Sequence, residues 1–278
     1  MLSLHTNAAS LSTQNSLGRT QTALSTSLTR LGTGYRVNSA MDDAAGLQIA
    51  TRLNAQIRGM TVAQRNTQNG ISMLQTAEGA LDEVSNIMLR MKDLATEGAN
   101  GTATTTDRAA LDAEFTELGN ELTNIMTNTK FGGQALLTGG TLAASITFQI
   151  GSDAAETMAF DASAQMTALN TAITALKAGD VAASGVVANT AIGLANTAID
   201  AVGELRAKLG SGANRLDHVN NNLGNMSQNA AQARGRIMDV DYASESANMT
   251  AKQMMMQAGT SMLKQSSSMS QLVMGLMQ

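Results

Sequence analysis

The strongest constraint on the fold is an apolar or small residue at every third or fourth position through much of the C-terminal half. The run consists of Ala195, Ala198, Val202, Leu205, Leu209, Gly212, Leu216, Val219, Leu223, Met226, Ala230, Ala233, Ile237 and Val240. Alternating spacings of three and four are typical of an α-helix that packs along one side. At 1.5 Å per residue such a helix would be roughly 70 Å long. It therefore requires partner helices along its whole length.

Two shorter repeats of the same kind precede this run and predict a helical hairpin. The first contains Leu74, Ala77, Leu81, Val84, Met88, Met91 and Ala95, and the second contains Leu111, Phe115, Leu118, Leu122 and Ile125. Between them lies the polar stretch EGANGTATTTD. Its Thr106 is a candidate N-cap, and Asp107 suits the positive end of the helix dipole.

The stretch between the second and third repeats has a different pattern. The segment SITFQIG places Ile146, Phe148 and Ile150 at alternate positions, and TMAFD follows after a short polar link. This alternation predicts a small β-hairpin within about residues 131–165. The Ala-, Gly- and Thr-rich stretch of about 161–190 is predicted to contain variable, exposed loops.

Both ends of the chain combine apolar stripes with almost no negative charge. There is no acid from Met1 to Met41 and none after Glu245. The N-terminal stripe contains Leu4, Leu11, Leu17, Leu24, Leu28 and Leu31, and the C-terminal stripes contain Met249, Met256 and Leu263, and Met255, Met262, Met269 and Leu276. Such weakly charged helices are marginal alone, so we expect them to be completed by packing against other molecules.

These patterns predict a mainly α protein with long helical hairpins. The paired N- and C-terminal segments are expected to form a coiled-coil-like bundle, with the small β-hairpin region in the middle. The chain has no Cys or Trp, and aromatic residues make up only 2%. Its core must therefore be built from Ala, Leu, Ile, Val and Met along helices.

Charge and hydropathy exclude several classes of partner. The formal net charge is −4 and the sequence contains no basic stripe, which argues against a nucleic-acid ligand. No stretch approaches the roughly 18 consecutive apolar residues of a membrane span, and the start lacks the features of a cleaved signal peptide. We therefore predict neither a nucleic-acid nor a membrane partner.

The sequence offers little with which to build a catalytic or metal site. His5 and His218 are the only histidines, and no zinc, nucleophile-elbow or phosphate-loop motif is present. We therefore predict a protein that is not an enzyme, with no catalytic, metal-binding or cofactor-binding residues and no cofactor.

The adjacent carboxylates of Asp42 and Asp43 are better explained as the start of a helix than as a reactive pair. Ser39 stands three residues before Asp42, so its hydroxyl can cap the helix while the carboxylate reaches back, as in a capping box. Asp43 adds negative charge to the first turn, where the helix dipole favours it.

The residues around this acid pair also carry a family resemblance. The stretch LGTGYRVNSAMDDAAGLQIATRL resembles the N-terminal signature of bacterial flagellin, the subunit of the flagellar filament. At the other end, ARGRIMDVDYASESANMTAKQMMMQAGTSML resembles the flagellin C-terminal region. The resemblance covers roughly residues 1–130 and 205–278, and the middle matches at FGGQALL and TFQIG. Two long matches at the correct ends are far more specific than a short motif.

The resemblance implies a domain organisation and a location. Residues 1–41 and 238–278 would form an inner domain in the filament core, and residues 42–237 an outer helical domain that includes the β-hairpin. The subunit would serve motility in an extracellular flagellum. It would leave the cell unfolded through the flagellar type III export apparatus, without a cleaved signal peptide.

The resemblance also implies partners. These are other copies of the chain in a helical homopolymer, an export chaperone at the C-terminal segment, and the filament cap and hook-junction proteins. Some flagellins are sensed by a Toll-like receptor, and the corresponding positions here are Arg90 and Leu94 in LRMKDLATEGAN and Glu114 in LDAEFTEL. Alternatively, these three residues serve packing and solvation of the helices.

Two other functions are also compatible with parts of the sequence pattern. A hook-filament junction protein shares the terminal pattern but caps the filament rather than extending it. A cytoplasmic signalling hairpin of the chemoreceptor type also has long heptads, although it predicts a Glu-rich surface and stably folded ends. The acid-free ends argue against the signalling hairpin.

Overall fold

The structure is a computed structural model in which residues 7–275 are described, with side chains as far as Ser268. The chain divides into two compact units. The first unit contains residues up to Gln56 together with those from Gln228 onward, and the second unit spans Ile57–Ser227.

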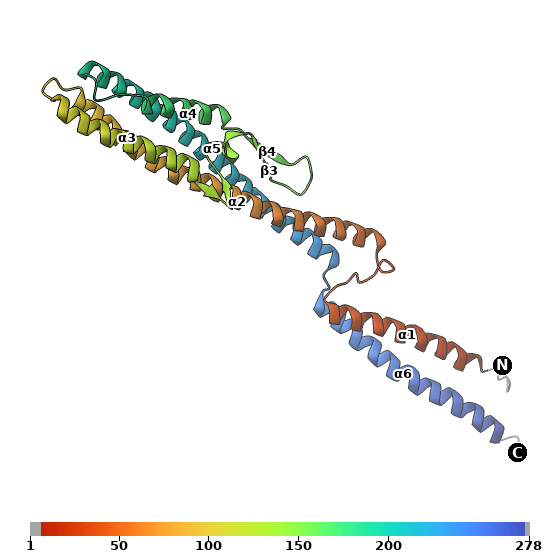
Figure 1. Cartoon of the computed structure of the whole chain (residues 1–278). Helices are drawn as coiled ribbons and strands as arrows, with labels where there is room; N and C mark the ends of the chain where they lie inside the picture. The colour runs from red at the N-terminus through yellow and green to blue at the C-terminus, as the bar shows by residue number, and fades with distance from the viewer. Residues whose placement is uncertain (1–6, 276–278) are drawn as a thin grey trace. The chain divides into compact units, whose positions relative to one another are not determined.

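The three apolar repeats become the cores of three helices in the second unit. The first repeat lies in α2 (Ala44–Gly98), the second in α3 (Thr105–Asn128) and the third in α5 (Gly185–Met238). All seven residues of the first repeat are buried in one hydrophobic core, as are Phe115 and Leu122 of α3. The apolar residues of the third repeat from Ala195 to Leu216 belong to the same core, and Val219, the next residue of the repeat, is half-buried. Figure 1 shows these helices within the described chain. The helical part of the fold is therefore as predicted.

The third repeat extends beyond the helix that contains it. The α5 helix ends at Met238, so Val240 lies outside it, and Met226 is 46% exposed. Among the described helices, α5 also has one window with a mean hydropathy of 1.2, which meets the length and hydropathy criterion for a membrane span. Core helices of soluble proteins meet the same criterion, and the apolar stripe of α5 belongs to the core of the second unit.

The predicted β-hairpin is present. Strands β3 (Ile146–Gln149) and β4 (Thr157–Phe160) pair antiparallel, with Ile146 opposite Phe160. Met158 and Phe160 are buried, so alternate residues of β4 anchor the hairpin to the core. A second, shorter hairpin joins β1 (Lys130–Phe131) to β2 (Gln134–Ala135), and a 3₁₀ turn, η1, spans Thr141–Ala143.

The prediction of exposed loops over about 161–190 was wrong for much of that stretch. Helix α4 (Ser163–Lys177) occupies it and buries Met166, Leu169, Ala172, Ile173 and Leu176. Four of these residues recur at spacings of three, four and three, which is a helical signal that the low-complexity composition obscured. The helix is part of the hydrophobic core.

The start of α3 differs from the prediction in one residue. Thr104, and not Thr106, is the N-cap, and its hydroxyl accepts a hydrogen bond from the backbone N–H of Asp107 at 3.2 Å. The Asp107 carboxylate accepts in turn from the Thr104 backbone N–H at 3.0 Å, which completes a capping box. Three consecutive threonines left the choice of cap open in the sequence.

The first unit is built around two antiparallel helices, α1 (Ala8–Thr33) and α6 (Tyr242–Gly275), which lie side by side in Figure 1. Beyond them, the two connecting segments form an isolated antiparallel bridge between Tyr35 and Asp239. The Arg36 backbone N–H donates to the Met238 carbonyl at 2.6 Å, and the Arg36 guanidinium donates to the Ile237 carbonyl at 2.9 Å. The described terminal segments are therefore paired from α1 and α6 through to these connections.

Candidate assembly surface

The helices α1 and α6 bury few of their apolar side chains against each other. In α1 the buried residues are Leu24 and Ser27. The other members of the facing stripes, Leu17, Leu31, Met249, Met256 and Leu263, are half-buried. A pair of helices with so little enclosed apolar surface gains little from burial.

Other stripe residues of the same two helices face solvent. Leu11 is 65% and Leu28 52% exposed in α1, and Met255 is 55% and Met262 65% exposed in α6. Thus the two heptad stripes of α6 differ, because one packs toward α1 and the other points outward. Leu4 and Leu276 lie outside the described residues, as does the side chain of Met269. Each of the two helices therefore carries exposed apolar side chains that the other helix does not cover.

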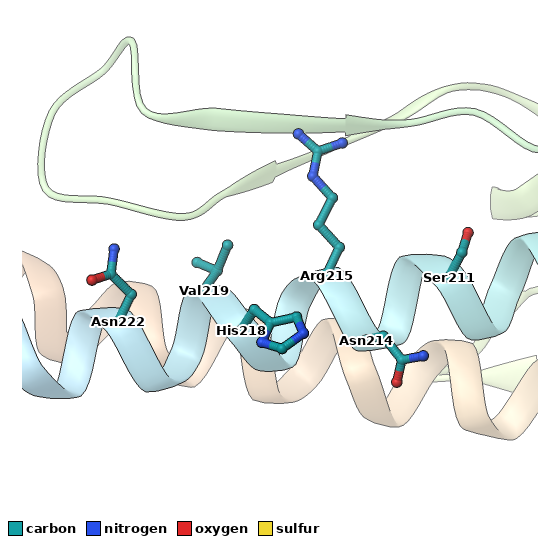
Figure 2. A pocket seen from close by; sticks show the side chains of 6 residues that line it. All are labelled: Ser211, Asn214, Arg215, His218, Val219 and Asn222. Carbon is teal, nitrogen blue, oxygen red and sulfur yellow. The ribbon is translucent and has the colours of Figure 1, made fainter.

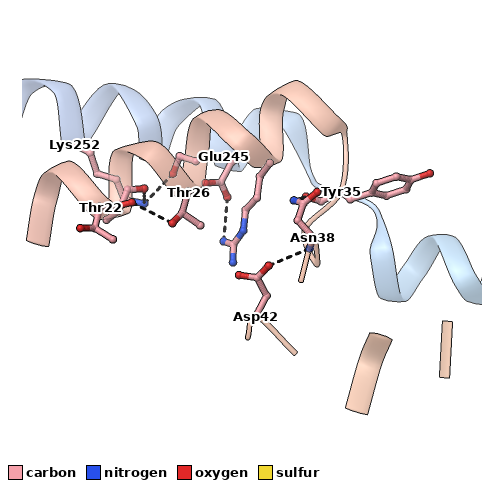
Figure 3. Close-up of polar contacts among 10 residues, drawn as sticks. Thr22, Thr26, Tyr35, Asn38, Asp42, Glu245 and Lys252 are labelled. Atoms are coloured by element: carbon pink, nitrogen blue, oxygen red, sulfur yellow. Dashed lines mark hydrogen bonds and ion pairs between the residues drawn. The ribbon is translucent and has the colours of Figure 1, made fainter. Parts of the chain in front are cut away.

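Polar contacts also join α1 to α6, and the sequence reasoning did not anticipate them (Figure 3). The ammonium of Lys252 donates to the Ser27 hydroxyl at 2.9 Å and to the Ala23 carbonyl at 3.4 Å. Arg30 and Glu245 form an ion pair at 3.8 Å. The signal was nevertheless present, since Glu245 and Lys252 continue the rhythm of Met249 and Met256 at spacings of four and three.

The start of α2 assigns different roles to the three residues predicted there. The carboxylate of Asp43 is the cap, because it accepts from the Gly46 backbone N–H at 2.8 Å. The Asp42 carboxylate reaches back to the backbone N–H groups of Asn38 and Ser39, each at 3.0 Å, and these bonds hold the pKa of Asp42 below its usual value. The Ser39 hydroxyl accepts from the Met41 N–H instead of capping the helix. The capping role expected of Ser39 therefore belongs to Asp43.

The three residues expected at a receptor contact lie in different environments. The Arg90 guanidinium on α2 donates to Glu114 on α3 at 2.7 and 2.9 Å, and this bond raises the pKa of Arg90. Both side chains are about half exposed. Leu94 is only 1% exposed and belongs to the hydrophobic core. Arg90 and Glu114 are thus available on the surface, whereas Leu94 packs inside.

One face of α5 forms an open hollow but lacks a reactive group. Ser211, Asn214, Arg215, His218, Val219 and Asn222 line it, and Figure 2 shows Arg215 pointing toward the β3–β4 hairpin. No acid lies among these lining residues to orient the exposed His218, and Ser211 supplies the one hydroxyl. Within residues 7–275, no three His, Asp or Glu side chains come together in a group that could hold a metal ion. The hollow is thus lined by five polar side chains and Val219 of one helix.

The fold defines a class: a mainly helical protein whose two terminal helices, α1 and α6, pair and leave apolar side chains exposed. A model of the bacterial flagellin N-terminal helical region matches residues 4–141, and a model of the C-terminal helical region matches residues 192–277. The chain therefore belongs to the bacterial flagellin family, whose members are structural subunits of the flagellar filament.

Individual relatives agree with this assignment. Flagellin from Halalkalibacterium halodurans is 40% identical over 249 residues, which cover 89% of each chain. Flagellin A from Vibrio anguillarum is 33% identical over an alignment of 379 positions that covers both chains completely. This chain has 278 residues, so the Vibrio protein carries additional segments.

Among solved structures, a protein assigned as flagellar hook-associated from Vibrio parahaemolyticus has the same fold. It is 19% identical to this chain, with a TM-score of 0.60 that covers 71% of this chain and all of the other. At that identity the likeness concerns the fold alone.

Proposed function

We propose that this chain polymerises into the flagellar filament by burying the exposed stripes of α1 and α6 in contacts with neighbouring copies. The single observation that carries this mechanism is the exposure of Leu11, Leu28, Met255 and Met262 on helices that are otherwise weakly charged. Contacts between unlike surfaces of identical copies do not close, and they generate an open helical polymer. The apolar burial contributes roughly 25 cal/mol per Å² removed from water.

Removal of the C-terminal helix tests the mechanism. A chain that lacks residues 246–278 is expected to remain soluble and to form no filaments, because it loses every stripe of α6 beyond Glu245. Growth from sonicated filament seeds, followed by negative-stain electron microscopy, is the measurement, with the full chain as the control. Circular dichroism shows whether the second unit is still folded. Filaments grown from a folded truncation would refute the mechanism.

We assign residues 1–41 and 238–278 to the filament core and residues 42–237 to the outer part of the subunit. The exposed apolar residues of α1 and α6 support this assignment, since a buried position suits such surfaces best. Limited proteolysis of filaments and monomers tests it. Under the assignment, cleavage sites within both terminal segments are protected more strongly in filaments than in monomers, and equal cleavage in both forms would contradict it.

Export through the flagellar type III apparatus, without a cleaved signal peptide, is part of the same proposal. We assign a chaperone to the C-terminal segment, because the exposed methionines of α6 form an adaptable apolar surface that needs cover before assembly. The filament cap and the hook-junction proteins complete the set of partners. Two measurements test the route. A strain that lacks the export ATPase should not secrete the chain, and mass spectrometry of the chain secreted by the parent strain should find its N-terminus intact.

We also propose that the receptor for flagellin in innate immunity contacts the Arg90–Glu114 pair. Both side chains are exposed and lie on adjacent helices, which supports a composite polar contact. The burial of Leu94 limits that residue to supporting the helix. Arg90→Ala monomers are expected to activate the receptor less than the parent chain in a reporter-cell assay. Equal activation by the two would eliminate this role.

The alternative, a hook-filament junction protein, is the weaker candidate. The relatives with 33% and 40% identity are flagellins, and only a remote likeness of fold points toward the hook-associated class. A junction subunit would not extend long tubes by itself, so the seeded growth assay separates the two functions.

A further inference from the structure

The apolar stripes that join α1 to α6 do not by themselves specify how the two helices are aligned. Leu17, Leu24 and Leu31 recur every seven residues in α1, and Met249, Met256 and Leu263 recur every seven residues in α6. All six are at least partly buried. A slip of one heptad would therefore place apolar side chains opposite apolar side chains again, and it would displace one helix by roughly 10 Å along the other.

Ser27 and Lys252 interrupt both stripes at the same level. Ser27 lies between Leu24 and Leu31 in the α1 rhythm and is 0% exposed. Its hydroxyl accepts from the Lys252 ammonium at 2.9 Å. Buried polar groups are costly unless they find a partner, so this contact favours the alignment in which the two residues meet.

The pair of Glu245 and Arg30 discriminates more strongly between alignments. Glu245 is 8% exposed, and its carboxylate lies 3.8 Å from the Arg30 guanidinium. A slip of seven residues toward the start of α1 would place Glu245 opposite Ala23, which carries no charge, and the opposite slip would carry Glu245 beyond Thr33, where α1 ends. A buried carboxylate that loses its cation is strongly destabilising. Lys252 could find Thr20 in one of these slips, so the acid is the more selective residue.

A steric contact marks the same alignment. Gly259 of α6 lies against Leu17 of α1 so closely that a Cβ on residue 259 would be 3.0 Å from the Leu17 Cδ1. Near the other end of the pair, the Asn7 side chain donates to the Ser266 carbonyl at 3.1 Å. Contacts along the whole length of the two helices therefore agree on one register.

We propose that Glu245 with Arg30 and Lys252 with Ser27 are the specificity-determining residues that select this register of α1 and α6 over the one-heptad slips. A polar residue in an otherwise apolar helix seam is a known physical device for fixing register. The selected register sets where Leu28 of α1 stands relative to Met255 and Met262 of α6. It thereby defines the surface that each subunit presents to its neighbours, and in this respect it extends the proposed assembly mechanism.

The absence of native cysteine allows the register to be read directly by crosslinking. In the full chain, Gly259→Cys is combined with Leu17→Cys for the native register. For the two slips it is combined with Ser10→Cys or Leu24→Cys, each with Leu17→Ala added so that the new Cβ on residue 259 does not crowd Leu17. A short thiol crosslinker is expected to join only the pair with Leu17→Cys. In the background Glu245→Leu with Lys252→Met, the ratio of slipped to native crosslinks is expected to rise at least about tenfold.

Matched variants make the outcome decisive. The control Gln253→Leu with Gln257→Leu adds similar apolar volume at exposed positions of α6 and should leave the native crosslink dominant. The exchanged pair Arg30→Glu with Glu245→Arg should also retain the native crosslink, whereas Glu245→Arg alone should lose it. Exclusive native crosslinking in the Leu/Met background would overturn the proposal. So would the loss of all crosslinks there, because selection requires that a competing register can form.

The same experiment separates this inference from the assembly mechanism. Crosslinks are measured in soluble protein, and filament growth is measured independently. A native crosslink that responds to the polar variants supports register selection even if no filaments grow. Failure of the parent pair Leu17→Cys and Gly259→Cys to crosslink would overturn the inference without bearing on polymerisation.

Discussion

The ring of Phe160 lies directly against Gly212. Phe160 ends strand β4 and is 5% exposed, and a Cβ placed on residue 212 of α5 would be 2.5 Å from its Cε2 atom. The side chain of Leu74 in α2 lies near the same point, at 3.3 Å. The β3–β4 hairpin therefore docks onto the helices through a notch that only glycine provides.

Substitution Gly212→Ala is expected to destabilise the protein despite the better helix propensity of alanine. The methyl group would push against a buried ring, and overpacking of this kind costs about 1–3 kcal/mol. The free energy of unfolding, measured by denaturant titration, should fall accordingly. Gly203→Ala is the control on the same helix, because nothing lies within 4 Å of its added Cβ. That control should be neutral or stabilising by up to about 1 kcal/mol. Equal effects from the two substitutions would contradict the docking notch.

Leu81→Ala is expected to be among the most damaging truncations in α2. Leu81 is 0% exposed at the centre of the first apolar repeat, and removal of a buried leucine typically costs about 2–5 kcal/mol. Leu89, on the same helix, is 47% exposed, so Leu89→Ala should change the free energy of unfolding by only about 0.5 kcal/mol. Thermal unfolding of both variants measures the difference. A larger loss from Leu89→Ala would mean that the repeat does not face the core.

The sequence predicted the helices and the β3–β4 hairpin because their apolar spacing is regular over many residues. It failed at Thr104, where three threonines in a row satisfy the same capping chemistry and only the chain geometry chooses among them. It also failed at α4, because alanines and threonines weaken the contrast between the buried and exposed faces of a helix. The sequence also does not show which of two stripes is buried. Met255 and Met256 both lie on heptad stripes, but Met256 packs inward and Met255 faces outward.

The polar contacts of the assembly surface show the same limitation. Glu245 and Lys252 occupy stripe positions in the sequence, but their partners lie more than 200 residues away in the chain. Local periodicity carries no information about which residue of α1 stands opposite. The burial of Leu94 favours the packing alternative for that residue, and a position in a motif does not reveal burial in advance.

Acidification is expected to weaken the start of α3. The Thr104 hydroxyl and, with a smaller effect, the Thr104 backbone N–H donate hydrogen bonds to the Asp107 carboxylate. These bonds lower the pKa of Asp107 below the reference value of 3.8. A carboxyl group whose pKa is lower in the folded state stabilises the fold fully above the unfolded pKa. This contribution is lost as the pH falls through the folded pKa. The capping box should therefore hold at neutral pH and weaken progressively as the pH falls below about 4.

Thermal unfolding of the parent chain and of Asp107→Ala across this range provides the test. The variant should be less stable at neutral pH, and the difference should close in acid as the parent loses the same charge. Glu117→Ala, which removes an exposed acid from the same helix outside the cap, accounts for the effect of net charge alone. A difference that stays constant from neutral pH into strong acid would show that the charge of Asp107 is not what stabilises the helix.

Charge on the exposed stripe of α6 is expected to block polymerisation without unfolding the subunit. Met255→Glu with Met262→Glu places two carboxylates where apolar side chains are 55% and 65% exposed in the single chain. If neighbouring copies bury this stripe, each carboxylate would have to be desolvated without a partner, which is strongly unfavourable. Seeded growth, measured by turbidity and negative-stain microscopy, should therefore stop, while the circular dichroism spectrum stays close to that of the parent.

The control Gln253→Glu with Gln257→Glu adds the same charge at exposed polar positions of the same helix, and growth should continue. Arrest of both variants would attribute the effect to net charge, and continued growth of the methionine variant would show that this stripe lies outside the contacts between subunits.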